Sequence, residues 1–171
     1  QRHKGRVFCT LPLSSVSSRM PFHINGFFDL QSDRQGLYSD ENAIGIGARR
    51  YDWNKKLIRY GCGEVSARLV SSIANMSETK TGMLYKFWPT IREVDTDLLD
   101  TLPFSFYQNI SRFTCIPCGL EKVLKRPNEV IQIKKHREEP KIRNGLLADG
   151  LLIPKPQLPE YISKGFKSVE N

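Results

Sequence analysis

Apolar residues alternate with polar ones at the start of the chain, a pattern that predicts β-strands. We expect one strand over residues 5–13, a Ser-rich turn over 14–20 and a second strand over 22–30. Gly26 lies inside the second strand and indicates a bulge or a close backbone approach. The apolar side of the first strand consists of Val7, Cys9, Leu11 and Leu13.

A polar loop over 31–51 then leads to an amphipathic helix that we expect to end near Asn75. Asp52 is placed to cap its first turn. Gly61 and Gly63 interrupt the helical pattern, and either close packing against a neighbour or a break in the helix would explain them. The predicted apolar stripe contains Leu57, Val65, Leu69 and Ile73.

The second half of the chain predicts further helices. A ladder of apolar residues at a spacing of four ends near 113, and Pro103 lies within it, so we expect a helix over 104–112 and a separate short turn before the proline. Shorter elements follow: a helix over 120–124, a strand over 130–133, a strand or turn over 146–153, an extended stretch over 154–159 and a helical turn over 161–166. The ladder contains Val94, Leu98, Leu102, Phe106, Ile110 and Phe113.

These elements predict a mixed α/β fold of the α+β class, in which a small N-terminal sheet is backed by an amphipathic helix and followed by a helix-rich C-terminal lobe. The polar stretch 77–83 is the expected linker between a lobe over 1–76 and a lobe over 84–171.

The composition narrows the class of protein. Of 171 residues, 39% are hydrophobic and 26% charged, which excludes the low-hydrophobicity disordered class. No apolar run approaches the roughly 20 residues that a membrane span needs, so we expect no membrane partner. The first residue is Gln1 and not Met, and we expect the chain to be a fragment of a longer protein.

A net charge of +8 makes an anionic partner, including nucleic acid, one hypothesis for function. Half of that charge lies within 121–145, where eight Lys or Arg alternate with four Glu. Interleaved acids without aromatic residues favour a solvated mixed-charge face over a stacking platform for single strands.

Cys115 and Cys118 form a Cys-x-x-Cys motif, which can bind metal or form a redox disulfide. Zinc would need a second ligand pair, and the remaining Cys and His residues do not have the spacing for one. A redox site would need a preceding strand and a long following helix, and Pro127 ends the following segment. Structural cysteines are therefore the favoured interpretation.

The chain contains no complete glycine-rich phosphate loop and no nucleophile elbow. His23 falls within an apolar strand, where a hydrogen-bonded packing role is favoured. We therefore expect this chain to be no enzyme by itself and to bind no cofactor. Arg34 follows a patterned strand at the start of a polar loop. It is either a solvated surface side chain or a guanidinium aimed at a phosphate bound elsewhere.

Residues 5–13 (GRVFCTLPL) and 21–34 (PFHINGFFDLQSDR) resemble the repeat modules of sacsin-like proteins, which carry a similar G-R-V-F-C-F-L-P-L-P run and then L-P-V-H-I-N-G-F-F-A-L-S-S-N-R-R. The resemblance continues through Asp52-Trp53-Asn54, through the Y-K-F-W-P stretch at 85–89 and to 151–166. It covers most of the chain, more loosely after Trp88.

The resemblance implies a segment placed like the middle domain of GHKL-type chaperones, downstream of an ATP-binding lobe. ATP and Mg would then bind to the parent protein, and the resemblance leaves open whether that protein hydrolyses ATP. Such proteins act as co-chaperones and organise intermediate filaments and mitochondria in the cytoplasm. The family's Asn-Arg-Arg is Asp33-Arg34-Gln35 here and the following loop is shortened, so Arg34 is the residue left to sense nucleotide.

From the resemblance we expect a chaperone-like module in the cytoplasm whose partners are the upstream ATP-binding lobe, chaperones and client proteins. The alternatives are a non-catalytic interaction scaffold and a basic nucleic-acid-binding module. The candidate interaction residues are Trp53, Asn54, Tyr85 and Trp88.

Overall fold

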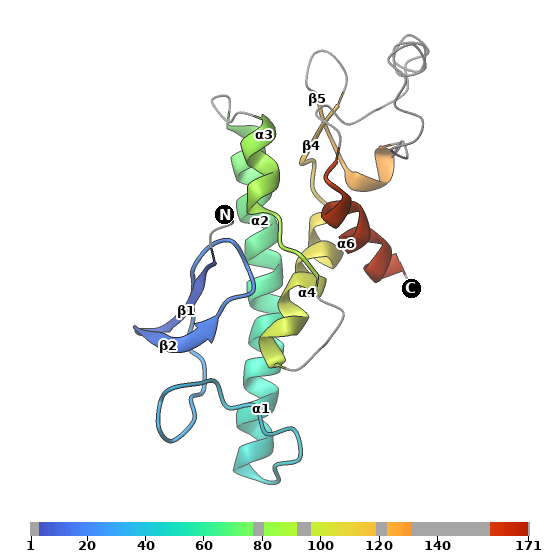
Figure 1. Ribbon diagram of the computed structural model, residues 1–171. Coiled ribbons are helices and arrows are strands. Elements are labelled where there is room, and N and C mark those ends of the chain that lie inside the picture. Colours follow the sequence, from blue (N-terminus) through green and yellow to red (C-terminus); the bar gives the residue numbers. More distant parts are fainter. Residues whose placement is uncertain (1–3, 77–80, 92–96, 119–122, 131–157, 171) are drawn as a thin grey trace.

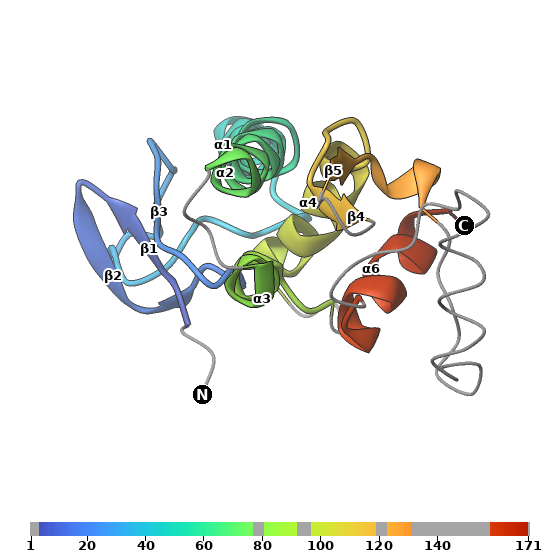
Figure 2. The ribbon, with the colours of Figure 1, turned by 90° about the horizontal axis from the view of Figure 1, so that it is seen from above.

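The structure, a computed structural model, describes residues 4–76, 81–91, 97–118, 123–130 and 158–170. In this part of the chain a small sheet lies on one side of a long helical rod, and shorter helices lie on the other (Figures 1 and 2). The combination of small sheets and extensive helix confirms the predicted α+β class.

The first sheet contains β1 (Arg6–Cys9), β2 (Leu11–Ser17) and β3 (Ile24–Asn25) in the order β2-β1-β3. β1 pairs antiparallel with β2 and parallel with β3. The single strand predicted over 5–13 is wrong, because the chain reverses at Thr10, whose left-handed φ of 67° ends the extended conformation.

The boundaries of the next two segments also differ from the prediction. β2 continues to Ser17 through the predicted turn, and β3 covers only two residues of the predicted strand over 22–30. The close approach predicted at Gly26 is present: its N–H donates to the Phe8 carbonyl at 3.1 Å, and a Cβ there would lie 3.0 Å from the Phe28 ring.

The helical rod consists of α1 (Ile46–Lys56), the π-helical turn η1 (Leu57–Cys62) and α2 (Gly63–Asn75). Its end at Asn75 confirms the prediction. The predicted start of the helix at Asp52 is wrong, because Asp52 lies within α1. Its carboxylate does not cap a first turn and lies 3.8 Å from the Lys56 Nζ.

The predicted apolar stripe of this helix is partly wrong, since Val65 and Leu69 are 66% and 43% exposed. The π turn contains one residue more than an α-helical turn. The next buried residue after Ile58 is therefore Gly63, five positions on, and the spacing of four no longer predicts which residues are buried. The buried residues on the rod are Asn54, Ile58, Gly63, Ser66, Ala67 and Val70.

Close packing explains Gly63. A Cβ at this position would lie 2.6 Å from the Ser105 Cβ, so only glycine admits the neighbouring helix this closely. The Ser105 hydroxyl donates to the Arg59 carbonyl of the π turn at 2.9 Å. The helix therefore widens at η1 and does not break.

Four short elements follow: α3 (Thr81–Leu84), η2 (Tyr85–Phe87), η3 (Leu98–Asp100) and α4 (Thr101–Ile110). The separate turn predicted before the proline is η3.

The helix predicted over 104–112 begins earlier, at Thr101, because Pro103 lies in its first turn, where the missing N–H costs no helical hydrogen bond. The predicted ladder is confirmed at four buried positions: Leu98, Leu102, Phe106 and Ile110.

The last described elements are β4 (Ile116–Cys118), β5 (Val123–Lys125), η4 (Pro127–Glu129) and α6 (Glu160–Glu170). β5 pairs with β4, so the helix predicted over 120–124 is wrong at its end. α6 is longer than the predicted turn over 161–166. Three predicted elements lie largely outside the described residues: the strand over 130–133 except Val130, the strand or turn over 146–153, and the extended stretch over 154–159 except Leu158 and Pro159. Residues 77–80 of the predicted linker and Val94 of the predicted ladder also lie outside them.

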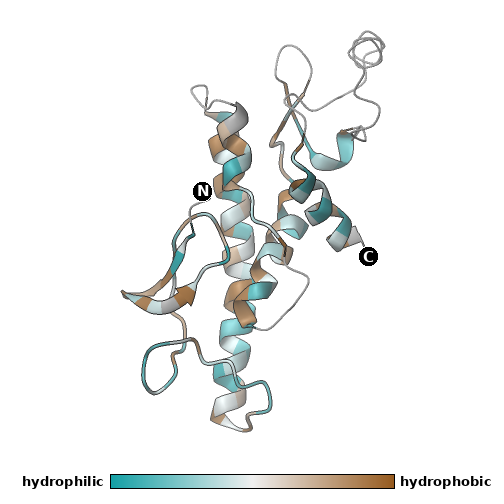
Figure 3. Cartoon of the chain, in the orientation of Figure 1, coloured by the Kyte–Doolittle hydropathy of each residue, from teal (hydrophilic) through white to brown (hydrophobic). Residues whose placement is uncertain are grey.

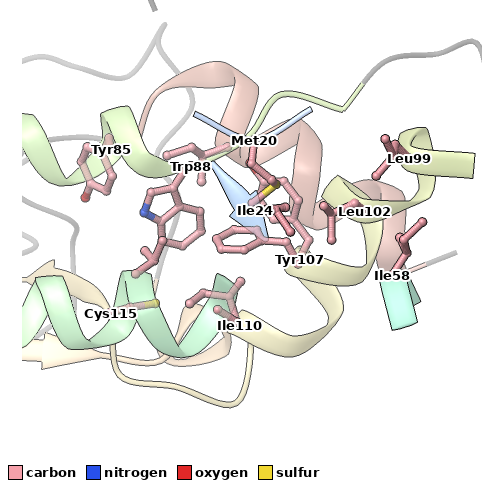
Figure 4. Packing of buried hydrophobic residues seen from close by; sticks show 14 of the residues in the cluster. Met20, Ile24, Ile58, Tyr85, Trp88, Leu99, Leu102, Tyr107, Ile110 and Cys115 are labelled. Carbon is pink, nitrogen blue, oxygen red and sulfur yellow. The ribbon is translucent and has the colours of Figure 1, made fainter. Parts of the chain in front are cut away.

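The hydrophobic core lies where α4 packs between α2 and α6 (Figures 2 and 4). Trp88 is fully buried at its centre, with ring centroids of Phe106, Tyr107 and Phe166 between 5.5 and 5.9 Å away. Buried residues from both sides of 77–83 join this cluster. The division into two lobes stays a prediction.

Candidate functional site

The Arg34 loop, residues 31–36, is short and closed at its base. Leu30 and Leu37 form an antiparallel bridge, and the Gln31 N–H donates to the Gly36 carbonyl at 2.9 Å. The Arg34 N–H donates back to the Gln31 carbonyl at 2.9 Å. The loop therefore presents the exposed Arg34 side chain at its tip.

The backbone of Arg34 is left-handed, with a φ of 56°. A residue with a Cβ reaches this region at a cost of roughly 1 kcal/mol. The turn around it is secured by the bond within the loop and by the Asp33 carboxylate, which accepts from the Gln35 N–H at 3.0 Å. The direction in which Arg34 leaves the loop is thus fixed by the fold.

Asn54 of α1 ties the two ends of the loop to the helix. Its side chain is fully buried, and its Oδ1 accepts from the Asp29 N–H at 2.8 Å. Its Nδ2 donates to the Asp29 carbonyl at 2.8 Å and to the Tyr38 carbonyl at 3.0 Å. One side chain therefore satisfies three backbone groups that flank the Arg34 loop.

Arg50 lies one helical turn before Asn54 and makes a second attachment. Its guanidinium donates to the Leu30 carbonyl, lies 3.4 Å from the Asp29 carboxylate and sits 4.2 Å above the Tyr38 ring. Sequence analysis missed Arg50, because the predicted helix began only after it. Its spacing of four from Asn54 would have placed both side chains on one helix face.

The other three predicted interaction residues lie in two environments. Trp53 is 49% exposed and its Nε1 donates to the Phe27 carbonyl at 2.7 Å. Tyr85 and Trp88 are buried in this chain's own core, as Asn54 is buried beneath the loop. Of the four, only the Trp53 side chain is open to a partner in this structure.

Cys115 directly precedes β4 and Cys118 is the last residue of that strand, and both are buried free thiols. Burial raises the pKa of Cys115 well above its usual range and that of Cys118 to about 11. A thiol with a raised pKa is a poorer nucleophile at neutral pH, because the thiolate is the reactive form.

No cluster of three or more His, Cys, Asp or Glu side chains that could hold a metal ion occurs within the described residues. Among the helices of the same residues, none has the length and apolar character to span a bilayer.

The arrangement as a whole places one exposed guanidinium on a closed loop, with both loop ends bonded to one rigid helix. An arginine held in this way can donate up to two parallel hydrogen bonds to a phosphate or carboxylate brought to it from outside. A displacement of the loop would pass to α1 through Asn54 and Arg50.

Comparison with known proteins finds a similarity to a characterised protein. Over 53 residues, 31% of this chain, the sequence is 47% identical to sacsin from Homo sapiens. The chain therefore contains a sacsin-related segment, and this segment spans 1% of the length of human sacsin. No family model matches the chain, and no solved structure matches it.

Proposed function

We propose that this chain is a module of a sacsin-like, chaperone-related protein, placed as the middle domain is in GHKL-type chaperones. In this proposal an ATP-binding lobe of the same parent protein binds ATP and Mg, and this module couples that lobe to client proteins and other chaperones. The setting is the cytoplasm, and the module itself is no enzyme.

The observation that carries the proposal is the attachment of the Arg34 loop. Arg34 is exposed, its backbone direction is fixed, and both ends of its loop are bonded to α1 through Asn54. An arginine supplied by one domain to the phosphates bound by another stabilises the charge of phosphoryl transfer. The same bonds let a change at the nucleotide reach the helical rod.

The test is ATP turnover of the parent protein with its ATP-binding lobe, measured for Arg34→Ala. Alanine keeps a Cβ at the left-handed position, so the backbone cost is unchanged while the guanidinium is removed. If Arg34 contacts the transferred phosphate, kcat falls about tenfold or more. Gln35→Ala, next to it on the same loop, is the matched control and leaves kcat unchanged.

Equal turnover for Arg34→Ala and the unaltered protein would refute the nucleotide-sensing role. An interaction scaffold without nucleotide coupling tolerates the same substitution, and its client binding stays unchanged in a pull-down with purified client. A nucleic-acid-binding module would instead lose affinity steeply as salt rises, which fluorescence anisotropy at two salt concentrations detects.

A further inference from the structure

The segment from Ile46 to Cys62, which forms α1 and η1, is the most basic helix of the described part of the chain. It contains five Lys or Arg and one Asp, a net charge of +4 out of the +8 of the whole sequence. Much of α1 has hydrophilic colours in Figure 3. Arg50 is used by the Arg34 loop, which leaves four cations on the outer side.

A basic-aromatic stripe follows the side of this helix that faces away from the core. Its residues repeat in steps of four, three and four, which keeps them on one face of the helix. The buried Asn54 and Ile58 mark the opposite face. The stripe consists of Arg49, Trp53, Lys56 and Tyr60, all exposed.

Apolar surface accompanies these charges. Tyr60 is 65% exposed, and Phe27, whose carbonyl holds the Trp53 indole, is 85% exposed. Large aromatic side chains left open beside cations are typical of interfaces, where aromatic residues and arginine supply most of the binding free energy. Lys56 is paired only loosely, at 3.8 Å from the Asp52 carboxylate, so its charge is available.

The spacing of the aromatic residues indicates the shape of the partner. Trp53 and Tyr60 are seven residues apart, which is about 10 Å along a helix axis. A second helix places apolar side chains at the same interval when they recur every seven residues, and acidic side chains beside them would face Arg49 and Lys56.

We propose that the basic-aromatic stripe is a docking surface for an acidic amphipathic helix of a partner protein, with apolar anchors seven residues apart. This inference is independent of the nucleotide-sensing role of Arg34.

A single-stranded nucleic acid fits the same face less well. Successive stacked bases need open ring faces at short intervals. The Tyr60 ring is accompanied by the Arg59 guanidinium at 5.6 Å, and Trp53 is fixed by its bond to the Phe27 carbonyl. Asp52 lies beside the stripe and would repel phosphates, whereas a peptide can place an apolar side chain there.

The chain has a built-in reporter for the test. Its two tryptophans are Trp53, which is half exposed, and Trp88, which is fully buried. A change in tryptophan emission on titration therefore reports on the stripe. The 171-residue chain is titrated with a Glu-rich helical peptide that has leucines seven residues apart, with a peptide of the same composition whose leucines are adjacent, and with single-stranded oligothymidylate.

The proposal predicts that the first peptide binds and that the peptide with adjacent leucines binds at least about tenfold more weakly. The double variant Arg49→Glu, Lys56→Glu weakens the first peptide about tenfold or more by reversing two charges. Lys86→Glu is the matched control, because Lys86 is exposed in η2, directly after α3 at the other end of the rod in Figure 1. It changes the Kd by less than about twofold.

Equal binding of the two peptides would overturn the proposal, because charge alone would then account for it. Preferential binding of oligothymidylate, or no binding of the first peptide, would overturn it as well. Unchanged circular dichroism of each variant shows that the fold is intact, as expected for exposed positions.

Discussion

Asn54→Ala is the most informative substitution for the attachment of the Arg34 loop to α1. It removes three hydrogen bonds at once, from the Asp29 N–H and to the carbonyls of Asp29 and Tyr38. It leaves the rest of α1 unchanged, and alanine has a higher helix propensity than asparagine. Any loss of stability therefore comes from the lost contacts of the buried side chain and not from helix propensity.

The magnitude follows from the three bonds. Each contributes about 1 kcal/mol net. The Asp29 carbonyl keeps the Tyr38 N–H as a donor at 2.9 Å, so the Asp29 N–H and the Tyr38 carbonyl are the groups that the loss of Asn54 affects most. We expect the free energy of unfolding to fall by about 2–4 kcal/mol. Asn54→Asp keeps the acceptor for the Asp29 N–H but loses both donors, so it recovers only a small part of this loss.

Two assays separate a local from a global effect. Urea unfolding gives the free-energy change, and limited trypsin digestion gives the rate of cleavage after Arg34. Once the Asn54 bonds are lost, the loop opens more often and cleavage at Arg34 accelerates about tenfold or more, since local opening governs proteolysis. Asn75→Ala is the matched control, because Asn75 is exposed and makes one bond, to the Ser71 carbonyl at 2.8 Å.

The reasoning is refuted if Asn54→Ala unfolds within about 0.5 kcal/mol of the unaltered chain, as surface substitutions do, and is cut after Arg34 no faster. Such a result would mean that the Arg34 loop keeps its conformation without the Asn54 bonds.

Two further predictions concern the core. Gly165→Ala lowers stability by about 1–3 kcal/mol although alanine favours helices, because its Cβ would lie 2.1 Å from the Tyr107 ring; a higher urea midpoint would contradict this packing. Burial raises the pKa of Cys62 and of Cys118 from 9.0 to about 11, so the folded chain holds these protons more tightly than the unfolded chain. The stability that this provides is complete below pH 9 and is lost as the pH rises toward 11, which urea midpoints across that range would show, and a constant midpoint would disprove it.

The sequence pattern predicted the buried residues correctly where one face of a regular helix packs on the core. The ladder of Leu98, Leu102, Phe106 and Ile110 has a spacing of four, and all four residues are buried. Helical periodicity is visible in the sequence because each position depends only on its neighbours along the chain.

The sequence pattern gave wrong predictions where a single residue changes the direction of the chain or the register of a helix. Thr10 reverses the first strand without Gly, Asn or Asp to mark a turn, and alternation continues on the far side of it. The π turn moves the buried stripe by one residue, so a strict spacing of four selected Val65 and Leu69, which are exposed. Neither feature has a local composition that distinguishes it.

The candidate site was partly predicted. Arg34 and Asn54 were selected from the sequence, but the partners of Asn54 come from Asp29 and Tyr38, on the far sides of a loop. Such contacts depend on how the loop closes, which periodicity does not encode. Arg50 was not selected, because the predicted helix began after it.

The extra residue in η1 has a geometric consequence for the Arg34 loop. Each residue turns a helix by about 100°. A residue inserted into a regular α-helix would turn Asn54 by that angle, away from the backbone groups it binds. The π turn absorbs the extra residue instead, because Ile58 and Gly63 lie five residues apart and are both buried. Removing one residue from Leu57–Cys62 would restore a step of four on the same face, so Asn54 and the Arg34 loop would keep their direction while the helix would lose its widened turn beside Ser105.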